Sequence, residues 1–359
     1  MGRRRAGSIA AARRWFAVGL IFALMHAAGG ARAWGQGAAG SSATTWTVTI
    51  VLPPLLVAGQ AATLAVLGTD GKLARGVEVE IGPDIRVHTD PIGRAYFTVP
   101  AGGKYVIAKS DGSSAAALVD AAAPAAPTKT IAIAQQVSRE DSFSICGGGF
   151  SGDAEANRVE LGGEPALVLA ASPECLVVLA APKTAPGTTA VTVKTARAEW
   201  TGETTLVSLR YEPPQPPLVA QKKSRLAVIA DGTAQPLRIR IQNESPGVLQ
   251  YLRGDKQELR TNGGTPNEAS FEVEAVSSGD YSFHAWIIPP ADTVEAGRYL
   301  DAAIPLAGEN LGKELKKLSG RLKRHPRDPD KVAAQLDGIL NVVITGELRT
   351  LLAAARNCL

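Results

Sequence analysis

Hydrophobic and polar residues alternate with a period of two along most of the chain, in short segments separated by turns. Asp70-Gly71, Asp90-Pro91-Ile92-Gly93 and Ala101-Gly102-Gly103 mark the turns of the first third. Alternation between such turns is typical of strands that bury one face. We therefore expect a β-sandwich over residues 46–120. Its strands are expected at Trp46–Val51, Ala61–Leu67, Gly76–Ile81, Ala95–Val99 and Lys104–Ala108.

The same pattern continues over residues 131–211, after a segment at 121–130 that is rich in alanine and proline. Gly147-Gly148-Gly149 lets the backbone turn sharply out of a strand, so that Phe150 can enter the core. Gly162-Gly163 predicts one hairpin and Pro186-Gly187 another. These features predict a second sandwich. Its apolar segments are Ile145–Phe150, Val159–Gly163, Ser172–Val178 and Ala190–Val193.

A proline-rich stretch, Glu212-Pro213-Pro214-Gln215-Pro216-Pro217, predicts a stiff connector to a third unit. Residues 218–290 again alternate with a period of two, and turns are expected at Asp231-Gly232 and Asn262-Gly263-Gly264. We expect a third sandwich there, with no family resemblance. Its strands are expected at Leu226–Ile229, Leu237–Ile241, Phe271–Val276 and Tyr281–Trp286.

From Asp292 the period becomes helical, and residues 292–359 predict a helical hairpin or small bundle. Asp292-Thr293-Val294-Glu295 resembles a capping box, and Gly346 is expected to separate the last two helices. One apolar stripe carries Leu311, Leu315, Leu318 and Leu322. Residues 313–331 hold eight basic and three acidic residues. The basic helix at 313–324 is expected to present a solvated face, with an anionic surface as the alternative.

The predicted fold class is therefore mainly β: tandem immunoglobulin-like β-sandwiches followed by a small C-terminal α-helical unit. The segment Ile145-Cys146-Gly147-Gly148-Gly149-Phe150, followed about 40 residues later by Pro186-Gly187-Thr188, resembles the IPT/TIG module. The order of residues from Thr89 to Tyr105 resembles the carboxypeptidase-regulatory or transthyretin-like modules of bacterial surface proteins. The IPT/TIG resemblance implies recognition or spacing, since modules of that type rarely perform chemistry.

Residues 1–33 have the layout of a secretory signal peptide. Five arginines precede an apolar run from Trp15 to Ala28, and Ala31-Arg32-Ala33 offers a cleavage site. Such a run is too short to span a bilayer comfortably, and no later segment is long enough to do so. Removing six arginines changes the balance from 38 minus 34 to 32 minus 34, which is near −2. We expect an exported protein of the periplasm, cell surface or extracellular space, without a nucleic-acid partner.

The chain has three cysteines, Cys146, Cys175 and Cys358. In an exported protein an odd number suggests one bridge and one remaining thiol. Cys146 and Cys175 fall in the same predicted sandwich and are the disulfide candidates, with two buried free thiols as the alternative. Cys358, next to last in the chain, is expected to be a frayed, unpaired thiol.

The inventory for catalysis or metal binding is sparse. His88, His284 and His325 fall in three different predicted units, and no zinc-type spacing, nucleophile elbow or phosphate loop is present. Asp153, Glu155 and Asn157 could offer oxygen ligands to calcium, but a solvated turn is the favoured interpretation. Trp46, Trp200 and Trp286 are expected in cores, not as platforms for sugar rings. We predict no catalytic residue, no metal and no cofactor.

These observations predict a non-catalytic exported protein for adhesion, spacing or protein binding at the cell envelope. One alternative is a glycan-binding protein of a polysaccharide system, whose loops at one end of a sandwich hold the glycan. Another alternative is an assembly factor for an envelope complex, in which the helical tail docks on a partner. The sequence does not identify the ligand.

Overall fold

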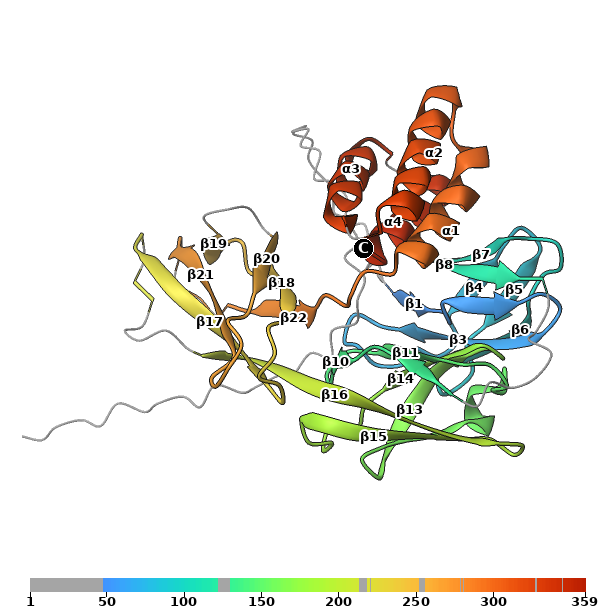
Figure 1. Cartoon of the computed structure of the whole chain (residues 1–359), viewed down its shortest axis with the longest axis horizontal. Coiled ribbons are helices and arrows are strands. Elements are labelled where there is room, and N and C mark those ends of the chain that lie inside the picture. Colours follow the sequence, from blue (N-terminus) through green and yellow to red (C-terminus); the bar gives the residue numbers. More distant parts are fainter. Residues whose placement is uncertain are drawn as a thin grey trace, which may run out of the picture.

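The structure is a computed structural model that describes residues 48–121, 130–212, 218–219, 221–251, 256–277, 279, 281–326, 328–343 and 345–359. The expected signal peptide (1–33), Trp46, and the prolines of the connector (213–217) lie outside these residues. The predicted fold class is confirmed at the level of its main features, sandwiches of β-strands followed by helices (Figure 1).

The first sandwich packs strands β1-β3-β6 against a five-stranded sheet, β2-β8-β7-β4-β5. The strands β1-β3-β6 are part of a larger sheet that continues into the second sandwich through β13. Leu56, Leu64 and Ile81 are fully buried between the sheets. Three of these strands were not predicted, β2, β5 and β8; β8 is rich in alanine, which strands disfavour. The strands are β1 (Thr49–Val51), β2 (Leu55–Val57), β3 (Ala61–Leu67), β4 (Glu78–Ile81), β5 (Ile85–His88), β6 (Arg94–Thr98), β7 (Tyr105–Ser110) and β8 (Ser113–Asp120).

The second sandwich follows two of its three predicted glycine turns. Gly148 and Gly149 adopt φ angles of 77° and 83°, and Phe150 packs edge-on against Trp200 with 5.0 Å between ring centroids. Gly162-Gly163 joins the β12–β13 hairpin as predicted. The strands are β9 (Ala132–Ile133), β10 (Gln136–Ser138), β11 (Phe143–Cys146), β12 (Arg158–Leu161), β13 (Glu164–Ala171), β14 (Cys175–Leu179), β15 (Gly187–Lys194) and β16 (Glu199–Glu212), with a 3₁₀ turn η1 (Ala154–Ala156).

The predicted hairpin at Pro186-Gly187 is wrong. Gly187 begins β15, and β15 pairs with β12 and β16, not with the preceding strand β14. The connection between β14 and β15 therefore crosses from one sheet of the sandwich to the other. A proline and a glycine favour a turn, but they do not decide which strands the turn connects.

The third sandwich shares strand β16 with the second. The first part of β16 pairs with β15, whereas Ser208–Glu212 pair with β17. The expected boundary between residues 211 and 218 therefore does not separate the two units cleanly, because the third core already includes Val207. The remaining strands are β17 (Lys223–Asp231), β18 (Arg238–Asn243), β19 (Leu249–Tyr251), β20 (Lys256–Arg260), β21 (Glu268–Ala275) and β22 (Phe283–Ile287).

The first and second sandwiches are joined through β3 and β13, which pair at Thr63 and Ala171. The Thr63 hydroxyl donates a 2.6 Å hydrogen bond to the carbonyl of Gly152. A Cβ atom at Gly152 would lie 1.9 Å from the carbonyl oxygen of Ala61, so only glycine allows this approach. An apolar seam reinforces the contact. It contains Val51, Ala65, Leu67, Leu169, Ala170 and Val177.

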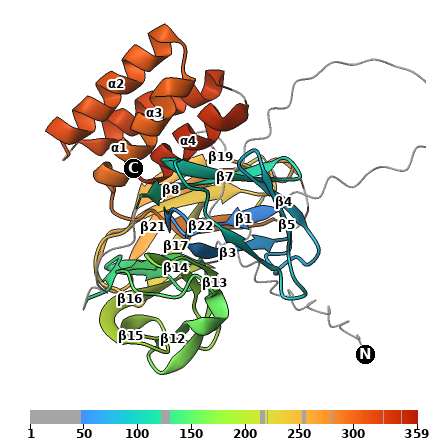
Figure 2. The ribbon, with the colours of Figure 1, turned by 90° about the vertical axis from the view of Figure 1, so that its right-hand side faces the viewer.

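Four helices form the C-terminal unit and cover one sheet of the first sandwich (Figure 2). Leu300 and Leu351 share one buried cluster with Ile107 and Leu118 of that sheet. Among the described residues, no helix is long and apolar enough to cross a bilayer. The elements are α1 (Thr293–Ala303), a 3₁₀ turn η2 (Ile304–Leu306), α2 (Glu309–Arg324), α3 (Pro329–Val342) and α4 (Gly346–Asn357).

Asp292 caps α1, since its side chain accepts hydrogen bonds from the backbone of Val294 and Glu295. The amide of Asp292 donates to the carbonyl of Cys358 at 2.7 Å, so the reciprocal half of a capping box is absent. The Arg298 side chain donates to Asp120 at the end of β8. The sequence predicted these helices but gave no sign that they return to the first sandwich.

Candidate functional site

The disulfide candidates are bonded to each other. Cys146 on β11 lies directly opposite Cys175 on β14, and their sulfurs are 2.07 Å apart. Cys358 is a free thiol, but the expectation that it is frayed is wrong. It caps α4, and burial raises the pKa of its thiol well above the ordinary value, so the thiol is neutral at pH 7.

The three histidines considered above, His88, His284 and His325, lie in three different parts of the fold. His88 lies 3.4 Å from the Glu78 carboxylate, His284 stacks on Trp286 at 5.0 Å, and His325 ends α2. Within the described ranges, no group of three or more His, Cys, Asp or Glu side chains could hold a metal ion. These side chains therefore do not converge on one another.

The three residues considered for calcium instead hold their own loop together. Asp153 accepts from the amide of Glu155, and Asn157 bonds to Ser151 through both its oxygen and its nitrogen. Glu155 lies 3.5 Å from Arg94. One carboxylate oxygen of Asp153 and the amide oxygen of Asn157 thus accept hydrogen bonds from backbone groups of the loop.

One carboxyl in the second sandwich is buried without full compensation. Asp141 is 3% exposed, and its Oδ1 atom has no hydrogen-bond partner within the described part of the chain. Burial raises the pKa of Asp141 to about 7, and the neighbouring Glu140 adds to the increase while Ser138 opposes it. The neutral form of Asp141 is therefore favoured by folding.

We expect Asp141→Asn to raise the free energy of unfolding by about 2 kcal/mol at pH 8 and to leave it nearly unchanged at pH 4. The folded pKa lies above the unfolded value, so the native protein loses stability as the pH rises from about 4 through 7. Thermal unfolding between pH 4 and 8 measures this. Asp84→Asn, at an exposed turn, is the control. An equal gain at both pH values would contradict the assignment.

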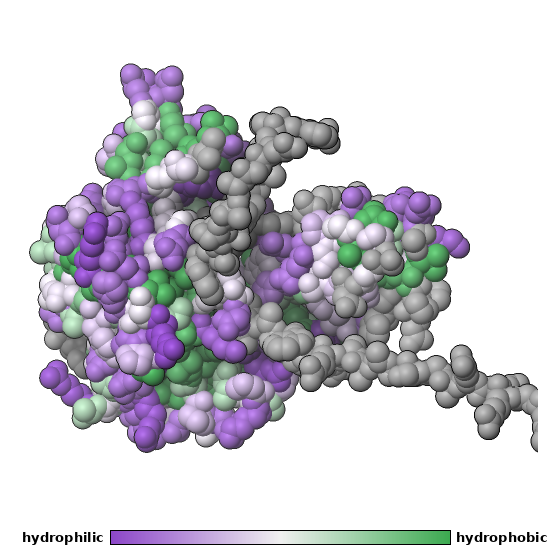
Figure 3. All heavy atoms as spheres, turned by 180° about the vertical axis from the view of Figure 1, so that it is seen from behind, coloured by the Kyte–Doolittle hydropathy of each residue, from purple (hydrophilic) through white to green (hydrophobic). Residues whose placement is uncertain are grey.

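The loops at the outer end of the third sandwich form the candidate binding surface, defined here by residues 218–219, 221–222, 244–248, 276–277 and 281–282. Backbone hydrogen bonds tie these loops together, from Gln221 to Ala275 and from Val276 to Val248. The third sandwich projects away from the other units (Figure 1). Seen from behind, the third sandwich shows a few hydrophobic residues among neutral and hydrophilic ones (Figure 3).

Three large apolar side chains on these loops are exposed: Val219 (49%), Val276 (38%) and Tyr281 (38%). Single exposed apolar residues are ordinary, but a cluster on tied loops is typical of an interaction site. Beneath them, Phe283 is the centre of an aromatic cluster. Its ring lies within 5.8 Å of the ring centroids of Tyr211, Tyr251, Phe271 and Tyr281.

Two polar side chains lie near the Glu244 carboxylate, Tyr211 in the aromatic cluster and His284 on the opposite face of β22, against Trp286. The Tyr211 hydroxyl and the Nε2 atom of His284 are buried and have no hydrogen-bond partner within the described residues. Burial raises the pKa of Tyr211 and lowers the pKa of His284. The Glu244 carboxylate is close enough to contribute to both shifts, and it partly offsets the lowering at His284. Sequence reasoning missed this surface, because its loops are far apart along the chain.

The basic helix α2 buries its apolar face and leaves its charged face in water. Leu315, Leu318 and Leu322 are buried, whereas Lys316 and Lys317 are exposed. Two other lysines of α2 are already paired, Lys313 with Glu309 and Lys323 with Asp301. The aromatic expectations also hold where the structure describes them, since Trp200 and Trp286 are 2% and 6% exposed.

Comparison with known proteins gives likenesses only among solved structures. No family model matches the chain, and no curated protein matches it. The plexin A4 extracellular region is 12% identical over 68% of this chain (TM-score 0.24). A Bacteroides ovatus mixed-linkage glucan utilization locus protein, SGBP-B, solved with a heptasaccharide, is 12% identical over 66% of each chain (TM-score 0.23). The N-terminal four Ig domains of Dscam1 isoform 7.44 are 9% identical, covering 67% of this chain and 72% of that one (TM-score 0.21).

This chain spans about a quarter of the plexin structure, since it covers 23% of that chain. Structural superpositions with TM-scores this low do not locate any site residue, and the fold is defined by its own strand pairing. The resemblance to IPT/TIG modules remains a prediction from the residues that carry it.

Proposed function

We propose that this protein is an exported, non-catalytic binding protein of the cell envelope, and that the outer end of its third sandwich contacts a partner protein. The observation that carries the proposal is the exposure of Val219, Val276 and Tyr281 on loops that are hydrogen-bonded to one another. Burying such a cluster against a partner is favourable by roughly 25 cal/mol per Å² of apolar surface. The disulfide supports an oxidising compartment.

The rest of the fold supports a carrier role. The first sandwich contacts both the second sandwich and the helical unit, and β16 continues from the second sandwich into the third. The third sandwich is also tied to the helices, because Glu258 lies 3.5 Å from Arg356 and Arg238 lies 3.2 Å from Asp330. This arrangement would present the outer loops on a supported arm.

The assembly-factor alternative has less support. Apart from the exposed Val294, the large apolar residues of α1 and α4 pack inside the molecule, as the full burial of Leu300, Leu351 and Leu352 shows. Deleting residues 292–359 would expose Leu118 and Ile107 of the first sandwich, so loss of a partner in that variant would not identify the tail as the docking element.

A photo-crosslinking amino acid placed at Tyr281 in the full chain, expressed in its native host, tests the proposal. We expect a discrete crosslinked species that disappears when Val219→Asp and Val276→Asp are added, because buried charges oppose an apolar interface. Tyr96 is the matched control, since it is 45% exposed on the first sandwich. No adduct at position 281, or equal adducts at both positions, would contradict the proposal.

The glycan-binding alternative is favoured by the exposed Tyr281 ring and by the exposed Glu244 on a neighbouring loop, which donates its backbone amide to Ser282. Tyrosine rings stack on apolar faces, and the Glu244 carboxylate could accept hydrogen bonds from hydroxyls. A glycan array with the purified mature chain distinguishes the two. If the chain bound a glycan and the Tyr281→Ala variant did not, the ligand of this surface would be a glycan and not a protein.

A further inference from the structure

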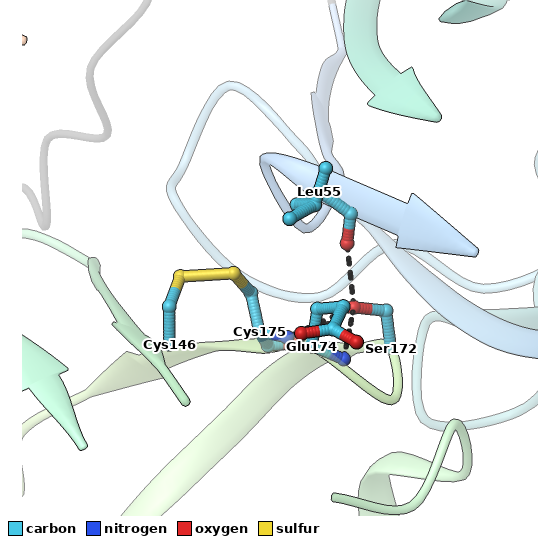
Figure 4. Close-up of a disulfide and its surroundings, with 5 residues drawn as sticks. All are labelled: Leu55, Cys146, Ser172, Glu174 and Cys175. Carbon is cyan, nitrogen blue, oxygen red and sulfur yellow. Dashed lines mark hydrogen bonds between the residues drawn. A yellow bond between two sulfur atoms is a disulfide. The ribbon is translucent and has the colours of Figure 1, made fainter. Parts of the chain in front are cut away.

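A cleft of about 210 Å³ lies where the first sandwich, the second sandwich and helix α1 meet. One wall is apolar and contains Pro54, Leu55, Leu118 and the Cys146–Cys175 disulfide. Figure 4 shows the disulfide beside Leu55, with the Ser172 hydroxyl hydrogen-bonded to the Leu55 carbonyl at 2.6 Å. This bond fixes the loop between β13 and β14 against the first sandwich. The apolar wall is therefore built from two units that are held together.

The other wall is the first turn of α1 and carries charge. Asp292, Glu295 and Arg298 line it, and Val294, 76% exposed, lies at the same turn. The Arg298 guanidinium is already paired with Asp120. The Asp292 carboxylate accepts backbone hydrogen bonds as the cap of α1, whereas no lysine or arginine of the described residues forms a salt bridge with Glu295.

More negative charge borders the cleft. Glu174 follows Pro173 next to the disulfide, and its Oε1 atom is buried without a hydrogen-bond partner within the described residues. Burial, with a contribution from Asp120, raises the pKa of Glu174. Around the joint there are thus four carboxyl groups, Asp120, Glu174, Asp292 and Glu295, and one guanidinium. An excess of negative charge beside an apolar wall is complementary to a ligand that carries a positive charge on an apolar stem.

We propose that this cleft receives the side chain of a lysine from a partner protein, with its methylene groups against Leu55, Pro54 and the disulfide and its ammonium toward Asp292 and Glu295. Lysine fits better than arginine because it is a compact charge on a flexible apolar stem, whereas a guanidinium needs a planar bidentate acceptor. The cleft is separate from the outer loops of the third sandwich. The inference can therefore fail while the proposed function stands.

The proposed contact gives binding a pH dependence. Burial raises the pKa of Glu295 to about 7, Asp292 adds to the increase, and Arg298 opposes it. The other groups facing Glu295 are Tyr299 and the Cys358 thiol, and the pKa of each is raised well above its ordinary value, so both are neutral. Glu295 gains its charge as the pH rises through 7. An ammonium should then bind more tightly at pH 8 than at pH 6.

The test uses the full mature chain and an acetylated, amidated hexapeptide with one central lysine, titrated by NMR with ¹⁵N-labelled protein. We expect shifts in the amides of residues 292–298, with a dissociation constant of about 1 mM at pH 8 and several-fold weaker binding at pH 6. Glu295→Gln should weaken binding about 10-fold, and the matched control Glu203→Gln, at an exposed site on β16, should not. Thermal unfolding checks that Glu295→Gln is folded.

Two further peptides test whether binding requires the positive charge of a lysine side chain. The same peptide with acetyl-lysine should not bind, and the arginine peptide should bind more weakly. Equal binding of the acetylated peptide, or unchanged binding by Glu295→Gln, would overturn the proposal. If pentylammonium bound as tightly as the lysine peptide, the proposal of a protein partner would be wrong, and the ligand of the cleft would be a free amine.

Discussion

Replacing Leu118 by aspartate should detach the helical unit from the first sandwich. Leu118 is 2% exposed and lies in the cluster that β8 shares with α1 and α4. A carboxylate there would be buried without a partner, which costs about 4 kcal/mol or more. Hydrogen exchange measured by mass spectrometry should show loss of protection in residues 293–303 and 346–357, while the second sandwich stays protected.

Leu306→Asp is the control for this experiment, because Leu306 belongs to the same unit but is 41% exposed. Its effect on the free energy of unfolding should stay within about 0.5 kcal/mol. If Leu118→Asp left the helices protected, the contact between the C-terminal unit and the first sandwich would not determine the position of the helices.

Removing the disulfide should give the second large effect. Cys146 and Cys175 are 29 residues apart in the sequence, and the chain-entropy model assigns closure of such a loop about 3.6 kcal/mol. We expect the double variant Cys146→Ser/Cys175→Ser to remain folded, because β11 and β14 also pair through their backbones from Phe143 to Cys146. Its free energy of unfolding in urea should fall by about that amount.

Cys358→Ser is the control, because it removes a cysteine without removing the disulfide. Cys358 is free and only partly buried, so its replacement should change the free energy of unfolding by less than about 1 kcal/mol. Adding a reductant to the unaltered protein should reproduce the double variant. A double variant as stable as the parent would mean that the bridge does not constrain the unfolded chain.

The alternating segments of the sequence predicted most strands correctly because each strand buries one face, which is a local property. Ala61–Leu67 was predicted with the bounds that β3 has. Gly162-Gly163 also behaved as predicted, since a two-residue turn requires the positive φ angles, 61° and 84°, that glycine adopts easily. Several of the missed strands are short, like β2, or rich in alanine, like β8, and they form because neighbouring strands supply their hydrogen bonds. The longest missed strand is β16, with 14 residues.

The candidate sites were far less accessible from the sequence. The cysteine pair was found because its members fall in one predicted unit. The outer loops of the third sandwich were not found, because Val219, Val276 and Tyr281 come from loops of two different sheets. These loops meet only when β17 pairs with β21, β18 pairs with β22, and the two sheets pack together. The same holds for the cleft at the joint, where Leu55, Cys175 and Glu295 are more than 100 residues apart from one another.

By itself, then, the pattern of side chains determined the class of fold, the succession of sandwiches and helices, and the residues available for a crosslink. Only the tertiary structure decided that β16 serves two sandwiches, that the helices return to the first sandwich, and which apolar side chains stay in water. The physical reason is that periodicity records which face of a segment avoids water, whereas the surface that covers this face is chosen by contacts between distant parts of the chain.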